Sequence, residues 1–513
     1  MKTYGRKTIY APFTEEQFLN GTDEDILNKI YDILNNSQAI HLRNKMESMY
    51  LQNYLYGDQD IKNKQKLTRT DINNKSVENW AWAFQDWKKA FLLGKPIQYA
   101  PANDVSNTEI AALNNYVKYE GKSSKDQDLF EDIFTVGRAF RYNIGSKVND
   151  EDEAPFDIIN LDVLDTEVVY SNSISHEQLL TYVHTDMMYI VSEVNPETGK
   201  PEQRQVNYDE YTVYTRNKQY VINNKTGVFK LAEGKVPQAL PYNAHIVVEY
   251  FFNKKRVSML ELVKDILDDI NDVENFDKDD IESFVNAIMV FTNAEVDEKG
   301  MEAIKKYGAV SIKSTEQKKA SVELLQSRLK SLDTQIYYLR KLSALHSILS
   351  VPQATQNGDI SNAETGKAVL TGQGFTSASV RIQNEENSFK ECDRKALKVI
   401  LKICRESSSS DIKTLKVSDI DIKFSRDLSD NLLTKTTALL NLATAQIPPE
   451  VRNAVVNLFS DPLSVTRMQE EYMKEQRELQ NELASRNTNN NPNQTNQKIN
   501  IIEDTTQTEN QEQ

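Results

Sequence analysis

The segment 258–293 is the part of this sequence that most restricts the possible folds. Most of its apolar residues recur every three or four positions, which is the spacing of one face of an α-helix. They are Leu262, Ile266, Ile270, Val273, Phe276, Ile281, Phe284, Val285 and Ile288. A helix of ~35 residues spans ~50 Å at ~1.5 Å per residue, which is longer than an ordinary globular helix. We therefore expect a rod or a helical bundle in the middle of the chain.

A second helix and a small insert complete this region. Residues 328–350 carry leucine and isoleucine at helical spacing. The segment between the helices, 294–327, is short and mixed, with a helix expected at Glu298–Tyr307 and strands at 309–312 and 321–325. The prediction is a helical hairpin with a compact αβ head.

A polar loop and a third long helix follow the hairpin. Pro352 ends the second helix, because proline cannot continue the helical hydrogen bonding. The loop occupies 351–363 and contains Gly358, which permits positive φ and so lets the loop change shape. The third helix is expected from about 363 to 403.

Helices are also expected at 13–56 and 76–94. Thr14 and Gln17 have the spacing of a capping box, and Thr22 precedes an acidic first turn. The second segment has an aromatic face, formed by Trp80, Phe84, Trp87 and Phe91. We interpret this face as packing core, because a platform for stacking bases would need interleaved basic residues.

The other segments differ in character. Residues 155–252 alternate β-branched or aromatic residues with polar ones and contain turn signals, which predicts an antiparallel β region. A strand is expected at 420–424, and helices at 430–445, 449–459 and 463–484. Residues 486–513 are rich in Asn, Gln and Thr and are expected to be disordered. The predicted fold class is α+β.

The chain is acidic, with a formal net charge of −15 and a pI near 5.1. Tight non-specific binding to DNA needs Lys and Arg contacts with phosphate, so the chain is a poor candidate for that class of protein. It shows no signal peptide and no apolar run of ~18 residues, so we expect synthesis in the cytoplasm and no membrane span. Cys392 and Cys404 have neither zinc nor redox spacing and are interpreted as buried thiols.

No catalytic motif is complete. Gly366-Lys367 resembles part of a phosphate-binding loop, but Ser361 stands where the first glycine is required and Ala368 where Ser or Thr is required. The five histidines are scattered, and neither HExxH nor GxSxG occurs. The sequence therefore predicts no catalytic residue, no metal ligand and no cofactor.

Acidic residues form a stripe along one face of the first long helix. Residues 261–282 contain ten carboxylates and two lysines. Asp265, Asp268, Asp269 and Asp272 have the spacing of a single helix face. Three interpretations stay open: a solvated face, the negative lining of a channel, and a two-metal nuclease site.

The insert and second helix have the opposite charge. Residues 305–341 contain nine Lys or Arg and three acidic residues. This patch could meet phosphate or an acidic partner, or it could be an ordinary solvated surface.

Four motifs, in this order, resemble those of phage portal proteins, specifically the family typified by the portal of phage SPP1. They are the aromatic–Gly element Tyr54–Gly57, the helix end Phe91–Ile97, the acidic helix segment Asp268–Phe284, and Ser361–Val369 after the loop. In the last motif Thr365 and Val369 replace the more usual Ser and Leu. The resemblance covers about residues 40–460.

The resemblance implies the portal fold and a ring of about twelve subunits at one capsid vertex. It divides the chain into a wing (1–257, helical at 13–94 and β-rich at 155–252, with the long helix 364–405), stem helices (258–293 and 328–350), a clip (294–327), a tunnel loop (351–363), a crown (406–485) and a tail (486–513).

The same resemblance implies roles for three groups of residues. The tunnel loop would face DNA through Gln353, Thr355, Gln356, Asn357, Gly358, Asp359, Ser361 and Asn362. The clip would dock partners through Lys305, Lys306, Lys313, Lys318 and Lys319. The acidic stripe would line the channel and repel phosphate.

The implied partners are the terminase large subunit, a neck or adaptor protein, the scaffolding and major capsid proteins, and the double-stranded DNA that passes through. The terminase would supply the work of packaging, and the location would be the portal vertex of the virion. Two other functions stay open: a metal-dependent nucleic-acid enzyme that uses the carboxylates of 261–282, and another virion scaffold such as a minor head protein.

Overall fold

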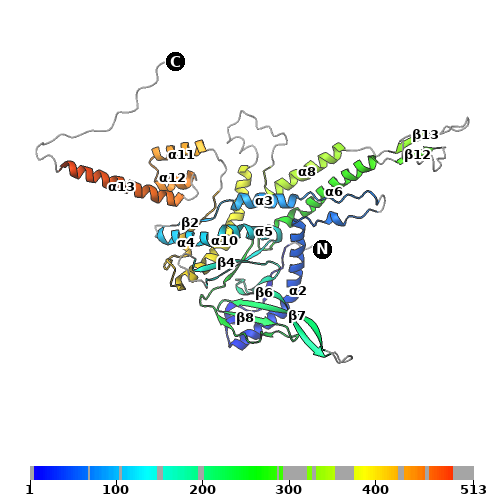
Figure 1. Cartoon of the computed structure of the whole chain (residues 1–513), viewed down its shortest axis with the longest axis horizontal. Coiled ribbons are helices and arrows are strands. Elements are labelled where there is room, and N and C mark those ends of the chain that lie inside the picture. Colours follow the sequence, from blue (N-terminus) through cyan, green and yellow to red (C-terminus); the bar gives the residue numbers. More distant parts are fainter. Residues whose placement is uncertain are drawn as a thin grey trace, which may run out of the picture. The chain divides into compact units, whose positions relative to one another are not determined.

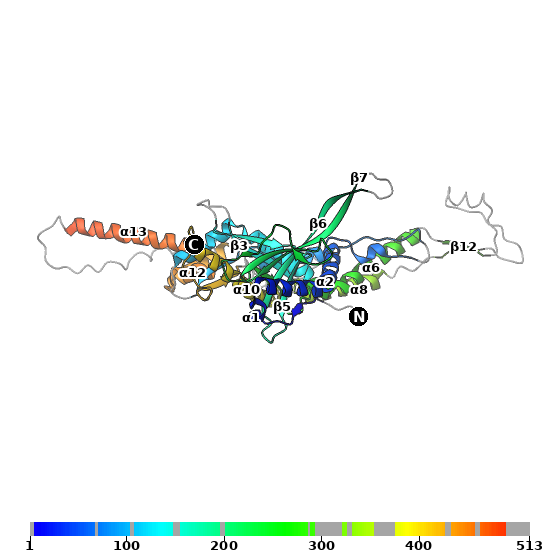
Figure 2. The ribbon, with the colours of Figure 1, turned by 90° about the horizontal axis from the view of Figure 1, so that it is seen from below.

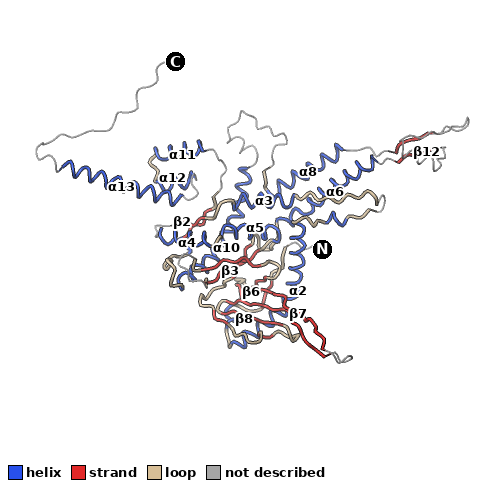
Figure 3. Tube along the Cα trace, in the orientation of Figure 1, coloured by secondary structure: helices blue, strands red, loops and turns tan. Residues whose placement is uncertain are grey.

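The computed structural model describes most of the chain. The described residues are 5–66, 70–102, 107–146, 154–194, 201–285, 288–292, 321–325, 331–352, 375–425, 432–456 and 462–488. The chain divides into two compact units, Met1–Arg426 and Asp427–Gln513. Helices and strands are mixed, in agreement with the predicted α+β class (Figures 1 and 3).

The first helices begin where the sequence predicts. Capping boxes at Thr14 and Thr22 start α1 (Glu15–Leu19) and α2 (Asp23–Leu55). In the second box, the Asp25 backbone N–H donates to the Thr22 hydroxyl at 3.3 Å, and the Thr22 N–H donates to the Asp25 carboxylate at 2.8 Å. Both predicted capping boxes are confirmed.

One sheet carries most of the predicted β region. Its strand order is β1 (Ile9–Ala11), β5 (Thr166–Ser171), β6 (Gln178–Val194), β7 (Pro201–Thr215), β8 (Lys218–Asn223) and β10 (Gln238–Ala239), with β9 (Lys230–Leu231) also paired to β8. β1 pairs with β5 in parallel, and the other pairings are antiparallel. β6 and β7 continue beyond their neighbours as a ribbon, as Figure 2 shows. The apolar face of α2 packs on this sheet.

A second core surrounds a smaller sheet. Its strand order is β11 (Val247–Tyr250), β3 (Ala139–Gly145) and β4 (Phe156–Leu161). The helices α5 (Lys122–Val136) and α10 (Phe375–Glu406) pack on its strands. Nearby lie α3 (Trp80–Leu93), α4 (Asn107–Tyr119), β2 (Gln98–Pro101) and its partner β14 (Ile420–Lys423). No element was predicted for 98–145, where β2, α4, α5 and β3 lie.

The aromatic face of α3 belongs to this core. Phe84 is buried, and Trp80, Trp87 and Phe91 are partly buried against the same cluster. The interpretation as packing core is confirmed. The helix begins at Trp80 rather than at 76, with Asn79 as its N-cap.

A buried charge network joins the elements of the second core. The Arg141 guanidinium on β3 lies 2.6 Å from Asp126 on α5. Lys122, one turn earlier on α5, lies 2.8 Å from Asp126 and 3.2 Å from Asp393 on α10. Asp393 also accepts hydrogen bonds from two tyrosine hydroxyls, one on β2 and one on β11. The two cations and two carboxylates therefore balance one another inside the core.

The first long helix is shorter than predicted. α6 ends at Val285 (Met259–Val285), and Ile288–Thr292 forms the strand β12, which pairs with β13 (Ser321–Leu325). The predicted helix end at 293 is therefore wrong. The segment 288–292 consists mainly of β-branched or aromatic residues, which suit a strand as well as a helical stripe. Tertiary pairing with β13 decides between the two.

The rest of the hairpin agrees with the sequence in part. α8 (Ser331–Leu349) packs against α6, and the predicted strand at 321–325 is confirmed. The strand expected at 309–312 and the helix at 298–307 lie outside the described residues.

The inward face of α6 from residue 271 onward is more polar than predicted. Of the predicted apolar stripe, Ile270 is buried, whereas Leu262, Phe276 and Ile281 are more than half exposed. Four-residue spacing instead places Asn271, Asn275 and Asp279 on the buried side, and all three bind the segment 59–79.

These three side chains form a polar ladder along α6. Asn271 Nδ2 donates to Gln59 at 2.5 Å, and Asn275 Oδ1 accepts from the Ser76 backbone N–H at 2.7 Å. Asp279 accepts from the Asn74 backbone N–H at 2.7 Å. Since α6 accepts hydrogen bonds from the backbone N–H groups of Asn74, Ser76 and Glu78, these residues before Trp80 do not need helical hydrogen bonds.

The third long helix carries both cysteines. α10 is described from Phe375 to Glu406, and the predicted start near 363 lies outside the described residues. Cys392 and Cys404 are buried and free of disulfides. Burial raises the pKa of each thiol to about 11, so the interpretation as buried thiols is confirmed.

The second unit is helical where described. α11 (Leu432–Thr444), α12 (Pro449–Val456) and α13 (Pro462–Thr488) agree with the predicted helices. α12 and α13 pack together, and Asn453 Nδ2 donates to the Thr466 hydroxyl at 3.1 Å. The predicted disordered tail begins too early at 486, because α13 continues to Thr488; the rest of the tail lies outside the described residues.

Replacing Asp393 with Asn should destabilise the first unit strongly. The change leaves Arg141 and Lys122 with one carboxylate between them, and breaking a buried pair costs about 3–5 kcal/mol. Urea unfolding of the purified protein measures the loss. Glu391→Gln, two residues earlier on α10, is the control, because Glu391 is 75% exposed at its side chain and should cost less than ~0.5 kcal/mol. Equal midpoints for the two variants would contradict the role of the network.

Candidate functional site

The four carboxylates of the acidic stripe do not share one environment. Asp265 and Asp272 are exposed, whereas Asp268 and Asp269 are half-buried. Asp268 accepts hydrogen bonds from the Tyr54 hydroxyl and from the ammonium of Lys264, both at 2.7 Å. The stripe is therefore partly engaged inside the subunit.

Two residues of the acidic stripe, Asp269 and Asp272, have different electrostatic surroundings. Asp269 pairs with Lys341 of α8 at 2.5 Å, which joins the two helices. Although Asp272 is exposed by surface area, its pKa is raised, first by the loss of some hydration to neighbouring groups and then by the charges of Asp268 and Asp269, with Lys64 opposing them. The exposed part of the stripe is thus a region where carboxylates repel one another and any further negative charge.

A nuclease site does not form on α6 within the described residues. There, two groups of His and carboxylate side chains converge closely enough to hold a metal ion: His41 with Asp165 and His184, and His184 with Asp186 and Asp209. Neither group includes a carboxylate of α6. A two-metal site needs carboxylates that converge on one point, and those of α6 are spread along a helix.

The histidine cluster lies between α2 and the large sheet. His184 Nε2 lies 3.0 Å from Asp209, and its Nδ1 lies 3.5 Å from Asp165. The ring of His41 from α2 lies 5.6 Å from that of His184, centroid to centroid. The Lys45 ammonium lies 2.7 Å from Asp165 and supplies positive charge at that carboxylate. The cluster is not visible in the sequence, because strand pairing and the packing of α2 on the sheet bring its residues together.

The pKa values of Asp165 and His184 in this cluster each depend on the other residue. The pKa of Asp165 is lowered to about 2, first by the adjacent His184 ring and then, against the opposing effect of burial, by Lys45. The pKa of His184 is raised, first by Asp165 and, against burial, by Asp209 and Asp186. The protonated ring is therefore favoured in the folded chain.

The other predicted site residues cannot be compared with the structure. The tunnel-loop residues at 353–362 and the clip lysines at 305–319 lie outside the described residues. Their proposed contacts stay predictions.

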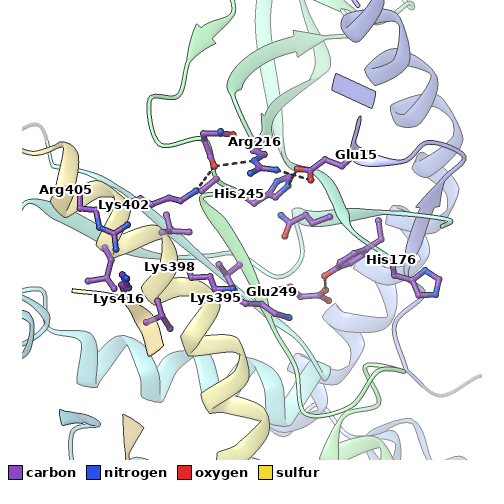
Figure 4. A pocket seen from close by; sticks show the side chains of 18 residues that line it. Glu15, His176, Arg216, His245, Glu249, Lys395, Lys398, Lys402, Arg405 and Lys416 are labelled. Atoms are coloured by element: carbon purple, nitrogen blue, oxygen red, sulfur yellow. Dashed lines mark hydrogen bonds and ion pairs between the residues drawn. The ribbon is translucent and has the colours of Figure 1, made fainter. Parts of the chain in front are cut away.

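A basic pocket lies where α10 faces β11 and the segments around it, and it was not predicted. Its volume is about 580 Å³. Figure 4 shows its charged lining, in which cationic side chains from α10 gather on one side and Glu15, Arg216 and His245 on the other. We define the basic pocket by its six cations, Lys395, Lys398, Lys402, Arg405, Arg216 and Lys416.

A sequence signal for this pocket exists. Lys395, Lys398, Lys402 and Arg405 are spaced by three, four and three positions, which places them on one face of a helix. The same helix also carries several acidic residues, so its net charge does not reveal this row of four cations. Arg216 and Lys416 join it only through the fold.

Like charges crowd inside the pocket. The pKa of Lys402 is lowered, first by burial and then by Arg216, Arg405 and Lys398. Its ammonium donates to the backbone carbonyl of Asn243 at 2.8 Å, a neutral acceptor. The pocket therefore favours an anion.

The comparisons with known proteins give one result that covers most of the chain. The family model described as phage portal protein, SPP1 Gp6-like, matches residues 34–484. No curated protein matches the chain significantly. Within the described residues, none of the helices combines the length and apolar character needed to span a membrane.

The raised pKa of His184 predicts a stability contribution that depends on pH. A raised folded-state pKa gives a contribution that is full below the unfolded value of about 6.5 and is lost as the pH rises through the higher folded value. The difference in urea midpoint between the unmodified protein and His184→Gln should therefore be larger at about pH 6 than at about pH 8. Asp165→Asn should weaken this dependence. A difference that is constant with pH would rule out the contribution.

Proposed function

This chain belongs to the SPP1 Gp6-like family of phage portal proteins, and from that premise we propose that it is the subunit of a ring through which the terminase packages DNA and the genome later leaves. The family is structural rather than enzymatic, and its members are virion components that connect head and tail. The observation that carries the proposal is the family match over residues 34–484.

Exposed apolar residues on the hairpin support assembly into a ring. Leu262 and Ile281 on α6 are 60% and 54% exposed, and Leu332 on α8 is 67% exposed. Neighbouring subunits in a closed ring would cover such residues, which a lone soluble subunit leaves in contact with water. We propose about twelve subunits, as the family implies.

The acidic stripe supports passage of DNA with weak contact. Asp265 and Asp272 are exposed, so a ring would present many copies of them. Carboxylates repel the phosphates of DNA and offer no binding traps along a channel. Asp268 and Asp269 are engaged inside the subunit, by Tyr54 of α2 and by Lys341 of α8.

We also propose the roles in DNA contact and partner docking that the resemblance implies. The segment 353–362 would touch DNA, and the lysines at 305–319 would dock the terminase large subunit and later a neck or adaptor protein. Scaffolding and major capsid proteins would hold the ring at its vertex.

Electron microscopy of the purified protein should show rings with a central hole. Leu262→Glu should reduce the ring population, because a carboxylate would be desolvated at the subunit contact. Light scattering after size-exclusion chromatography measures the assembled mass. Asp265→Asn, one turn along α6, is the control and should leave rings intact. Absence of rings from the unmodified protein would contradict the proposed function.

Neutralising the exposed carboxylates should slow packaging without affecting assembly. In Asp265→Asn/Asp272→Asn rings, phosphates would meet less repulsion and would dwell longer in the channel. The length of DNA protected from nuclease, followed over time in packaging reactions, measures the rate. Glu177→Gln/Glu233→Gln removes the same charge from exposed positions of the β region. Equal rates for both pairs would mean that the α6 carboxylates are merely solvated.

A further inference from the structure

The basic pocket contains more positive charge than its own carboxylates can neutralise. Glu15 is engaged by Arg216 at 3.2 Å and by His245 at 3.0 Å. Glu249 is held by both Nε and Nη2 of Arg256, at 3.0 and 2.8 Å, so its oxygens are directed toward that guanidinium. Neither carboxylate is left for the lysines of α10.

The cations of α10 bind mainly neutral backbone carbonyls or form a long, exposed ion pair. Lys402 and Arg405 donate to backbone carbonyls, at 2.8 and 2.7 Å. Lys395 lies 3.6 Å from Glu391, and both side chains are more than half exposed, so this pair contributes little. Among the described residues, no carboxylate lies within ion-pair distance of Lys398 or Lys402. The field inside the pocket is therefore positive and open to an added anion.

The walls between the cations are apolar. Val399 and Leu401 of α10, Val248 of β11 and Val417 also line the pocket. A volume of about 580 Å³ has the size of a small-ligand or peptide site. Inorganic phosphate would leave these walls uncovered, and a stiff DNA duplex could reach only the rim of the pocket. A flexible segment with both carboxylates and apolar side chains fits the charge and the walls together.

We propose that the basic pocket docks an acidic peptide segment, with apolar side chains between its carboxylates, from another protein of the capsid vertex. This inference rests on the proposed function, which places the chain among other virion proteins. Lys398 and Lys402 are the central contacts, because they lie one turn apart on α10 and lack carboxylate partners among the described residues.

Binding of a defined probe to assembled rings tests the proposal. The probe is a fluorescein-labelled peptide of alternating Glu and Leu, measured by fluorescence anisotropy. The unmodified ring should bind it, and the affinity should fall as salt rises. Lys398→Glu/Lys402→Glu should weaken binding at least about tenfold, which corresponds to ~1.4 kcal/mol. The matched control is Lys390→Glu/Lys423→Glu, which makes the same change of charge outside the pocket lining.

Competition experiments distinguish an acidic peptide from the other possible ligands of the pocket, inorganic phosphate and duplex DNA. A peptide with Gln in place of Glu should not displace the probe, and neither inorganic phosphate nor a DNA duplex should displace it at equal concentration. Displacement by phosphate alone would overturn the proposal in favour of a small-anion site, and displacement by duplex would overturn it in favour of DNA. Equal binding by both double variants would also overturn it. Rings that are visible by electron microscopy but do not bind the probe would refute this inference and leave the proposed function standing.

Discussion

Four buried charges join the elements of the second core. Arg141 and Lys122 are balanced by Asp126 and Asp393, and the tyrosine hydroxyls of β2 and β11 complete the hydrogen bonding of Asp393. A buried ion pair that loses one partner is far less stable than an intact one. The network is therefore satisfied only when α5, β3 and α10, which are distant in sequence, are docked together.

This arrangement determines what α10 presents outward. One side of the helix is held in the core by Asp393, Cys392 and apolar neighbours. The cationic side then faces the segments that carry Arg216 and Asn243, which forms the basic pocket. The same helix thus supplies carboxylate charge to the interior and positive charge to the pocket.

In the hairpin, polar side chains contribute much of the contact between α6 and its neighbouring segment. α6 holds its neighbouring segment through Asn271, Asn275 and Asp279 rather than through a continuous apolar face. Other apolar residues of the helix, such as Leu262 and Ile281, are exposed. A portal subunit that assembles into a ring can use them at its contacts, so the polar ladder and the exposed residues have complementary roles.

Local chemistry in the sequence determined the helix starts at Thr14 and Thr22, the β region, the α+β class and the resemblance to portal proteins, because capping and periodicity act over a few residues. Only the tertiary structure decided that 288–292 pairs as a strand, that α6 turns asparagines inward, and that His41 meets His184. The basic pocket belongs to the same group. Its four cations on α10 are visible in the sequence, but the missing countercharge is not, because Glu15 and Glu249 are taken up by residues that the fold brings to them.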